Sequence, residues 1–223
     1  DKYIGQWENG NMNGQGSSFM DGLNYTGQFS EDQKHGIGIL IFSDGDQYEG
    51  QFYNDKMNGH GKYSFSTGDE YVGQFKEEKM DGQGTYTYAD GDTFVGEWKE
   101  GHKHGNGKYS FPNGDFHSGE YKFGQKNGDG VLLLNGDHYT GVWKDDQKNG
   151  YFVLKINGGD IFEGEFKNDL PNGLGTYHYI NGNKYHGEYE NGQYKKGTYS
   201  FANGDKYEGE FENYEPNGQG IFI

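Results

Sequence analysis

Residues 47–69 read QYEGQFYNDKMNGHGKYSFSTGD, and this stretch decides the fold. Within it Tyr48, Gly50 and Phe52 alternate with polar residues, which predicts a β-strand with one face exposed to solvent. Turn-forming residues follow, and a second alternating run over 59–65 predicts a second strand. Apolar residues spaced three and four apart are absent, so we predict a β-hairpin and no helix.

The triplet of an aromatic residue, glycine and a second aromatic residue returns ten times, at intervals of 22 or 23 residues. A fixed short period predicts a repeat protein in which each unit contacts only its neighbours. We therefore predict an all-β fold over residues 1–223, an elongated, twisted, single-layer antiparallel meander of about ten hairpins. Because the chain begins in a strand at Asp1 and stops as one ends at Ile223, we interpret it as a piece of a longer array. The repeats start near residues 3, 25, 48, 71, 94, 117, 139, 162, 185 and 207.

The glycine inside each triplet has a packing role. Gly50 lies between Tyr48 and Phe52 on one face of its strand, and a ring can lie flat over neighbouring backbone only where no Cβ stands in the way. Only 30% of the residues are hydrophobic, below the usual level, but 20 Tyr, 16 Phe and 3 Trp can build a thin core of rings.

A second turn closes each repeat, at Gly68 in the quoted stretch and at Asp-Gly or Asn-Gly pairs elsewhere. Both residues of a type I′ turn need positive φ, so these pairs predict two-residue hairpin turns. The aspartate that often follows could suggest calcium, but each repeat offers too few oxygens for the roughly six to eight ligands of that ion. We predict that it caps backbone N–H groups of the turn. The pairs are Asp44-Gly45, Asp90-Gly91, Asn113-Gly114, Asn135-Gly136, Asn181-Gly182 and Asn203-Gly204, and the aspartates are Asp46, Asp69, Asp92, Asp115, Asp137, Asp160 and Asp205.

The composition limits the classes of partner. The net charge is −16 and every basic residue is lysine, which argues against nucleic acid and against direct binding of anionic lipid. The absence of cysteine excludes disulfides and thiolate metal sites and favours a cytoplasmic location. No apolar run approaches the ~18 residues of a membrane span. His102 and His104 could share a metal incidentally, but we expect no metal site, no cofactor and no catalytic activity, since no catalytic constellation stands out.

The repeated motif resembles the MORN repeat (membrane occupation and recognition nexus), and the similarity covers essentially the whole chain. The resemblance implies an elongated stack of hairpins that acts as a scaffold, often at membrane–cytoskeleton junctions and often as a long dimer. In some members the array instead grips a partner helix or accompanies a separate catalytic domain. In the third repeat the residues that carry the resemblance are Tyr48-x-Gly50-x-Phe52, then Gly59-x-Gly61-x-Tyr63-x-Phe65, then Gly68.

Four repeats depart from the motif. His117 replaces the leading tyrosine of the sixth repeat, and Phe152 replaces a glycine in the seventh. Lys195 and Lys196 stand at the first glycine of the ninth, where one residue is deleted, and Pro216 lies in the turn of the tenth. We expect bends near residues 128–152 and 192–197.

Apolar side chains on the outer face predict an interaction surface around the seventh repeat. Three consecutive strands carry them where other repeats have polar residues, and an alternative is that the curled sheet covers them internally. A smaller set is Ile37, Ile39 and Ile41. The larger set, called the outer patch below, is Val131, Leu133, Thr140, Val142, Tyr151 and Val153.

The last repeats predict self-association. The first strand (residues 2–8) and the last (219–223) are edges of the predicted sheet, and edges are templates for pairing with another chain. We expect a homodimer through the C-terminal repeats, unless the edge is exposed only because the chain is truncated. The residues are Tyr199, Phe201, Tyr207, Phe211, Ile221, Phe222 and Ile223.

The sequence supports three functional hypotheses. The first is a non-catalytic scaffold that dimerises and holds protein partners, in the cytoplasm and associated with cytoskeleton or membrane. The second is a module that binds an amphipathic partner helix in an aromatic groove. The third is the regulatory array of a severed enzyme. The predicted groove consists of Tyr48, Phe52, Tyr63, Phe65, Tyr71, Phe75, Trp98 and Trp143.

Overall fold

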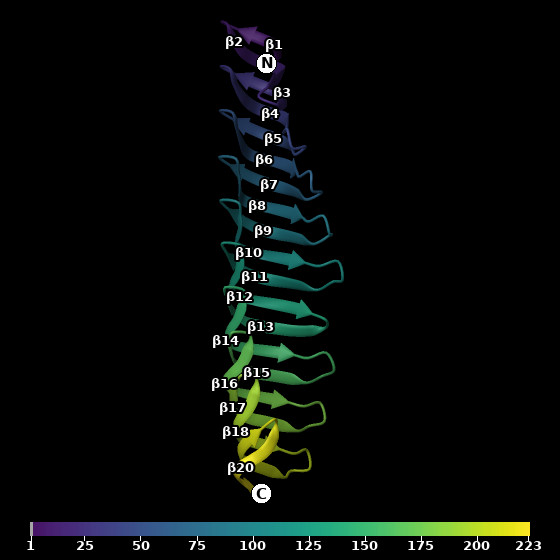
Figure 1. Ribbon diagram of the computed structural model, residues 1–223, viewed down its shortest axis with the longest axis vertical. Coiled ribbons are helices and arrows are strands. Elements are labelled where there is room, and N and C mark those ends of the chain that lie inside the picture. Colours follow the sequence, from purple (N-terminus) through teal and green to yellow (C-terminus); the bar gives the residue numbers. More distant parts are fainter. Residues whose placement is uncertain (1) are drawn as a thin grey trace. The chain divides into compact units, whose positions relative to one another are not determined.

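The computed structural model describes residues 2–223, which form twenty β-strands and contain no helix of a length and apolarity to cross a membrane (Figure 1). Asp1, where we expected the first strand to begin, lies outside the described residues. The chain divides into two compact units, Asp1–Pro112 and Asn113–Ile223. Within each unit the strands form an antiparallel meander in sequence order, which confirms the predicted all-β fold of hairpins.

The strands of the first unit are β1 (Lys2–Glu8), β2 (Asn11–Met20), β3 (Leu23–Ser30), β4 (Gln33–Ile41), β5 (Gln47–Tyr53), β6 (Lys56–Ser64), β7 (Glu70–Lys76), β8 (Lys79–Thr87), β9 (Thr93–Lys99) and β10 (His102–Ser110). Those of the second unit are β11 (Phe116–Lys122), β12 (Gln125–Leu134), β13 (Asp137–Lys144), β14 (Gln147–Lys155), β15 (Ile161–Lys167), β16 (Leu170–His178), β17 (Lys184–Glu190), β18 (Gln193–Ser200), β19 (Lys206–Glu212) and β20 (Glu215–Phe222).

Glycines of consecutive strands face one another across each sheet. Gly50 on β5 pairs with Gly38 on β4 and with Gly61 on β6, and the same pairing continues from strand to strand. In the first unit the row runs through Gly5, Gly16, Gly27, Gly38, Gly50, Gly61, Gly73, Gly84, Gly96 and Gly107.

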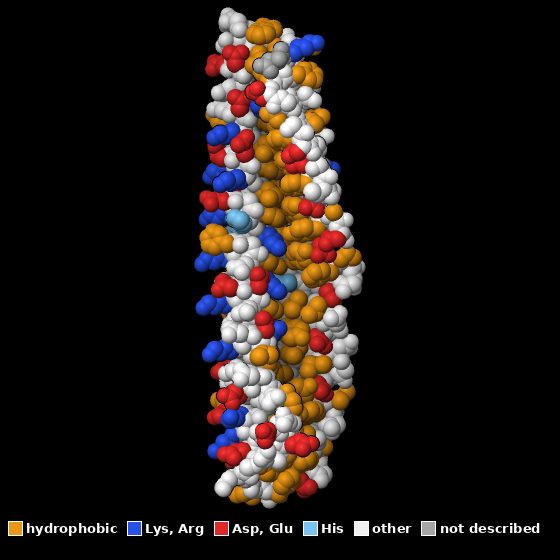
Figure 2. Space-filling view, viewed as in Figure 1, with side chains coloured by type: hydrophobic (Ala, Val, Ile, Leu, Met, Phe, Trp, Pro, Cys, Tyr) orange, Lys and Arg blue, Asp and Glu red, His pale blue; other side chains and the backbone are white. Residues whose placement is uncertain are grey.

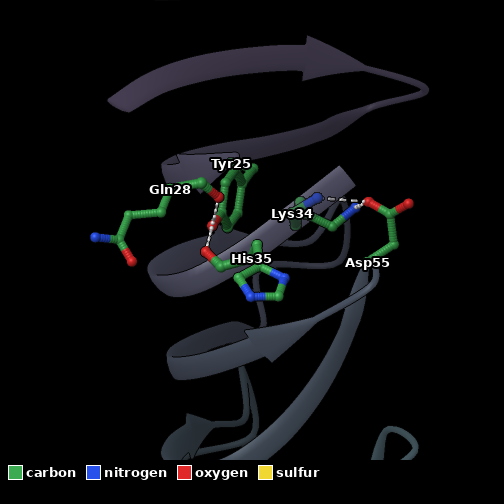
Figure 3. A network of polar contacts seen from close by, with 5 residues as sticks. All are labelled: Tyr25, Gln28, Lys34, His35 and Asp55. Atoms are coloured by element: carbon green, nitrogen blue, oxygen red, sulfur yellow. Dashed lines mark hydrogen bonds and ion pairs between the residues drawn. The ribbon is translucent and has the colours of Figure 1, made fainter. Parts of the chain in front are cut away.

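The ring that begins each repeat of the first unit, which is Phe94 in the fifth repeat and a tyrosine in the others, covers this row, as predicted. Tyr48 is fully buried, and a Cβ added to Gly61 would lie 2.5 Å from a ring carbon of Tyr48. The Tyr48 hydroxyl donates to the Gln51 carbonyl at 2.9 Å. Because only bare backbone leaves room for the ring, the glycines are required by close approach rather than by flexibility. Figure 3 shows the equivalent Tyr25, whose hydroxyl reaches the Gln28 carbonyl at 2.9 Å.

A β-bulge brings the hydroxyl of that tyrosine to a backbone acceptor. The β5–β6 register shifts between Gly50 and Phe52, and Gly59 on the opposite strand takes a φ of +82°. The bulge leaves the residues of β6 between Met57 and Gly61 without a partner on β5. The side-chain carbonyl of Gln51 accepts the His60 N–H at 2.7 Å, so that N–H is still hydrogen-bonded. This bulge accounts for the positive-φ glycine that stands at Gly59, two residues before the glycine of the row. The ninth repeat, where Lys195 and Lys196 replace it, has a smaller bulge.

Edge-to-face rings form the core of each unit. The Tyr48 ring lies 5.1 Å from Phe52 in its own repeat and 5.0 Å from Phe75 in the next, with interplanar angles of 87° and 80°. Aromatic pairs favour this geometry, so one tyrosine connects two repeats.

The predicted turn type is wrong at most Asp-Gly and Asn-Gly pairs. At Asp44-Gly45 only the glycine has positive φ (93°), and Phe42 and Asp46 close a longer loop through a 2.9 Å backbone bond. Two-residue turns with both φ positive occur instead inside the repeats, as at Asn54-Asp55 (47° and 66°). Among the predicted pairs, Asn135-Gly136 does have both φ positive, at 53° and 88°.

Hydrogen bonds join neighbouring repeats at both ends of the hairpins, in the loop that connects repeats and in the turn inside each repeat. Asp46 accepts the Ser66 N–H and the Tyr63 hydroxyl, each at 2.8 Å, so it caps the turn of the following repeat. On the other side the Lys34 N–H donates to Asp55 at 2.9 Å, as Figure 3 shows, and the Asp55 N–H returns to the Lys34 carbonyl at 3.0 Å. The predicted capping role of the aspartates is confirmed for Asp46.

The irregular repeats keep a ring over the glycine row by other means. His117 is buried, its Nε2 lies 2.6 Å from the position of a Cβ added to Gly130, and its Nδ1 lies 2.7 Å from the Tyr121 hydroxyl. In the ninth repeat the bulge is reduced, with Glu188 opposite Lys196 and Tyr189 opposite Tyr194. The bends that we expect in these regions remain predictions.

Candidate functional site

A second set of rings lies beside the core of the first unit and remains partly exposed. The third, fourth and fifth repeats each contribute a tyrosine and a second ring two residues later, and the second repeat contributes Phe42. Centroid distances are 4.5 Å from Tyr63 to Phe65, 5.7 Å from Phe65 to Tyr86 and 4.6 Å from Tyr86 to Tyr88. We call this series the aromatic ladder, which consists of Phe42, Tyr63, Phe65, Tyr86, Tyr88, Tyr109 and Phe111.

Aspartates hold the tyrosines of the ladder in place. The hydroxyl of Tyr86 donates to Asp69 at 2.9 Å, and that of Tyr109 donates to Asp92 at 2.5 Å, as Tyr63 does to Asp46. Burial, and then the hydrogen bond to the carboxylate, raise the pKa of each of these tyrosines. The rings are therefore neutral and fixed, and the carboxylates lie along one margin of the ladder.

A hollow of about 400 Å³ lies between the ladder and the turns of the following repeats. Figure 2 shows hydrophobic side chains gathered in a strip, with charged side chains along its margins. The lining is mostly apolar, which is typical of a surface that takes an apolar or aromatic ligand. The lining residues are Phe42, Met57, Tyr63, Phe65, Phe75, Glu78, Lys79, Met80 and Gly101.

The predicted groove residues fall into two groups. Tyr63 and Phe65 belong to the ladder and are partly exposed. The other six are buried in the core: Tyr48, Phe52, Tyr71, Phe75, Trp98 and Trp143.

The rest of the ladder was missed by sequence reasoning. The signal was present, because the second strand of each of these repeats ends in an aromatic-x-aromatic pair such as Tyr86-x-Tyr88. The sequence pattern does not say which of two inward-facing ring sets is covered, since that depends on how the strands curl.

The second unit has its own hollow, of about 350 Å³. Tyr194 stacks on Tyr185 with centroids 3.7 Å apart, and its hydroxyl is hydrogen-bonded to that of Tyr179. The Tyr189 hydroxyl is buried, and burial raises its pKa. The lining residues are Leu154, Phe162, Pro171, Tyr177, Tyr179, Tyr189, Gly192, Tyr194 and Tyr214.

The outer patch lies on the face opposite to the buried Trp143 and Phe152. Val131 pairs directly with Thr140, and Thr140 pairs with Val153, so these side chains form a row across three strands. Val131, Leu133 and Val153 are partly buried. Val142 and Tyr151 are 43% and 55% exposed.

The C-terminal residues also divide. Tyr207 and Phe211 are buried, and Tyr199 and Phe201 are partly buried. Ile221, Phe222 and Ile223 are exposed, and the last strand pairs with β19. The predicted self-association residues therefore differ: Ile221, Phe222 and Ile223 expose apolar surface, whereas the other four belong to the core or its margin.

No group of three or more His, Asp or Glu side chains within residues 2–223 is placed to hold a metal ion. His102 and His104 both lie on β10.

Comparison with known proteins gives structural likeness at low sequence identity. A structure of the G-box domain of the microcephaly protein CPAP matches with 13% identity and a TM-score of 0.49, covering 84% of this chain and 98% of that one. The TCP10 domain of Danio rerio CPAP matches with 12% identity and a TM-score of 0.47, covering 85% and 89%. Among curated proteins none matches.

The family comparison matches ten stretches that run along nearly the whole chain. Its description is MORN repeat, and it matches residues 3–22, 25–47, 48–70, 71–93, 94–116, 117–136, 139–151, 162–184, 185–206 and 207–223. These matches begin at the aromatic residue, or at His117, that covers or adjoins the glycine row of each repeat. The chain therefore belongs to the MORN repeat family.

Proposed function

We propose that this chain is a non-catalytic scaffold that holds segments of protein partners on the face that carries the aromatic ladder. The observation that carries the proposal is the aromatic ladder with its hollow. These rings are fixed by aspartates and remain partly exposed, although a separate set of rings already fills the core. Aromatic side chains, tyrosine and tryptophan above all, are enriched among the few residues that carry most of the binding energy at protein interfaces.

Selection of peptides from a displayed library tests this function. Peptides selected on the intact chain should bind about tenfold more weakly to Phe65→Ser, since loss of a central aromatic contact often has that effect. Val72→Ser is the matched control, because Val72 lies in the same unit and 47% of it is exposed on the opposite face. Failure to select any peptide, or equal loss in the two variants, would contradict the proposal.

Self-association is a second candidate function, supported by the exposed apolar residues outside the ladder. The outer patch offers Val142 and Tyr151, and the end of the last strand offers Ile221 and Ile223. In a chain with a net charge of −16, such apolar groups are the places where two copies can meet without charge repulsion. The scaffold would then be a dimer associated with the cytoskeleton or a membrane in the cytoplasm, as the family resemblance implies.

Light scattering after size exclusion distinguishes the two self-association surfaces. If the outer patch is the interface, Leu133→Ser combined with Val142→Ser should convert a dimer into a monomer. If the last repeats are the interface, Ile221→Ser combined with Ile223→Ser should do so instead. A monomer at all concentrations in the unaltered chain would remove both.

A further inference from the structure

We infer that the aromatic ladder of the first unit binds a basic, proline-rich segment in the polyproline II conformation. This inference rests on the proposed function, and it names the chemistry of the partner.

The spacing of the ladder matches the pitch of polyproline II. Equivalent rings, such as those of Tyr63 and Tyr86, lie two strands apart, because each repeat is one hairpin. Two strand spacings amount to about 9.6 Å. A polyproline II helix rises about 3.1 Å per residue with three residues per turn, or about 9.3 Å per turn. Every third ligand residue would thus meet an equivalent ring, with a mismatch of about 0.3 Å per repeat.

Other regular conformations fit this spacing less well. Residues seven apart on one face of an α-helix are about 10.5 Å apart, which exceeds the repeat by about 0.9 Å and accumulates to about 1.8 Å over the two intervals from Tyr63 to Tyr109. Residues on one face of a β-strand recur about every 6.8 Å. A ligand that makes the same contact with Tyr63, Tyr86 and Tyr109 in turn is therefore best served by polyproline II.

The rings also suit proline chemically. Successive rings of the ladder are tilted by 41° to 47° between Phe65 and Tyr109, which makes a series of shallow apolar steps. Aromatic-lined grooves bind polyproline II segments in this way, and the preformed ligand loses little conformational entropy. Because the tyrosine hydroxyls already donate to aspartates, the rings are held in position before a ligand arrives.

Charges of both signs lie beside the ladder: Lys79 lines the hollow and the Lys103 Nζ lies 4.8 Å from the centroid of the Tyr109 ring, but the carboxylates outnumber these cations and favour a basic ligand. Asp46, Asp69 and Asp92 lie beside the ladder as hydrogen-bond acceptors. Burial, and then the carboxylates of Asp69, Asp92 and Asp90, raise the pKa of Tyr88, so a negative field reaches the ladder. Lysine or arginine at the ligand positions that do not face the rings would meet these carboxylates.

The second unit lacks the same ladder and serves as an internal comparison. Its positions equivalent to Tyr63-x-Phe65 are Leu132-x-Leu134 in the sixth repeat and Leu154-x-Ile156 in the seventh. Aromatic pairs return in the eighth and ninth repeats as Tyr177-x-Tyr179 and Tyr199-x-Phe201. The uninterrupted ladder therefore belongs to the first unit.

Fluorescence anisotropy with labelled synthetic peptides tests the inference on the whole chain. The probe is a twelve-residue peptide of four Pro-Lys-Ala triplets, about 37 Å long as polyproline II. Its control has the same residues reordered so that no two prolines lie three apart, which keeps the charge constant. We expect the periodic peptide to bind at least about tenfold more tightly than the control.

Variants place the contact on the ladder. Tyr88→Ser and Phe65→Ser should each weaken binding of the periodic peptide about tenfold, and Val72→Ser and Val95→Ser on the opposite face should leave it unchanged. Phe65→Leu preserves apolar packing, so weaker binding by this variant in a normally folded chain would support a ring contact.

Three outcomes would overturn the inference. Equal affinity for the periodic and reordered peptides would mean that charge alone drives binding. Tighter binding of an amphipathic helical peptide of equal charge would reject polyproline II while supporting the peptide-binding function. Binding of the periodic peptide that is unaffected by Tyr88→Ser and Phe65→Ser would place it elsewhere on the chain.

Discussion

The third and seventh repeats cover the glycine row with rings from different strands. In the third, Tyr48 on the first strand of the hairpin covers Gly50 and Gly61. In the seventh, Phe152 stands on the second strand where other repeats have glycine, and its ring lies over Gly141, 2.5 Å from the position of an added Cβ. Tyr139, the counterpart of Tyr48, is only partly buried, and its hydroxyl lies 3.4 Å from Asp137.

This difference shows that the packing requirement of a repeat is broader than the family's sequence motif. What the packing needs is one fully buried ring over bare backbone in each hairpin, and Tyr48 and Phe152 are both 0% exposed. The register is unchanged, since Phe152 pairs with Gly141 and Gly164 as a glycine would. The family motif is therefore one of at least two ways to satisfy the same packing.

The largest expected effect comes from placing two rings in one site. Gly61→Phe would bring a second ring into the space that Tyr48 fills, and we expect a loss of at least about 3 kcal/mol in the free energy of unfolding. Urea unfolding followed by circular dichroism and tryptophan emission measures it. An unaltered midpoint would mean that Tyr48 moves aside as Tyr139 does, and that the site is more adaptable than the packing indicates.

Phe152→Gly restores the motif in the seventh repeat and should cost less. A buried Phe→Ala change typically costs about 3–5 kcal/mol, because a cavity remains. Here Tyr139 can turn inward over the glycines, so we expect about 1–2 kcal/mol. Phe162→Ala is the matched control, because no neighbouring tyrosine of its own hairpin is displaced from the row. Equal losses in the two variants would show that Tyr139 cannot take the vacated place.

Asp160→Ala removes one connection between repeats and should cost about 1–2 kcal/mol. The carboxylate accepts the Tyr177 hydroxyl and the Ile180 N–H, each at 2.8 Å. Asn183 plays the same part in the next repeat, so Asp160→Asn should recover at least half of the loss. Hydrogen exchange at Ile180 reports the cap directly. Unchanged protection in Asp160→Ala would contradict a capping role.

The smallest expected effect is that of Tyr71→Phe, at about 0.5–1.5 kcal/mol near neutral pH. The variant loses the hydroxyl bond to the Gln74 carbonyl at 3.0 Å and keeps the ring. Phe94 and Phe162 occupy the same position naturally and are buried. Urea unfolding near neutral pH measures the difference.

Alkaline pH sharpens this last comparison. Burial raises the pKa of Tyr71 from 10.0 to about 12. A raised folded-state pKa contributes stability that is present below the unfolded value and is lost as pH rises from about 10 through about 12. Tyr71→Phe should therefore lose less stability than the unaltered chain in that window, as followed by urea unfolding and tyrosinate absorbance. Parallel losses would show that Tyr71 ionises without regard to folding.

The period and the alternation of residues such as Tyr48, Gly50 and Phe52 were enough to predict the hairpins, their order and the rings over glycine. They were not enough to predict the turns. Asp44-Gly45 has the composition of a two-residue turn, but the chain there forms a longer loop that Asp46 ties to the next repeat. Such a tie joins residues twenty apart, which local propensity does not contain.

The candidate site was predictable only in part, for a related reason. Tyr48 and Tyr63 look alike in the sequence, since both face inward in alternating strands. The structure buries Tyr48 completely, because its ring lies over the glycine row with Phe52 and Phe75 packed against it, and leaves Tyr63 partly exposed. Which of the two rings is buried therefore depends on the register of the strands. The sequence shows that Phe152 replaces a glycine, but it does not show that the Phe152 ring would take the place of Tyr139 over the glycine row.

The strictly sequential pairing of strands has a mechanical consequence. Within each unit every interior strand is hydrogen-bonded to the strand before it and the strand after it along the chain. A force that draws the two ends of a unit apart would break the backbone hydrogen bonds between one pair of strands at a time, rather than shear many pairs together. Extension under tension should then proceed in steps of single hairpins, each step refolding on its intact neighbour when the load is released.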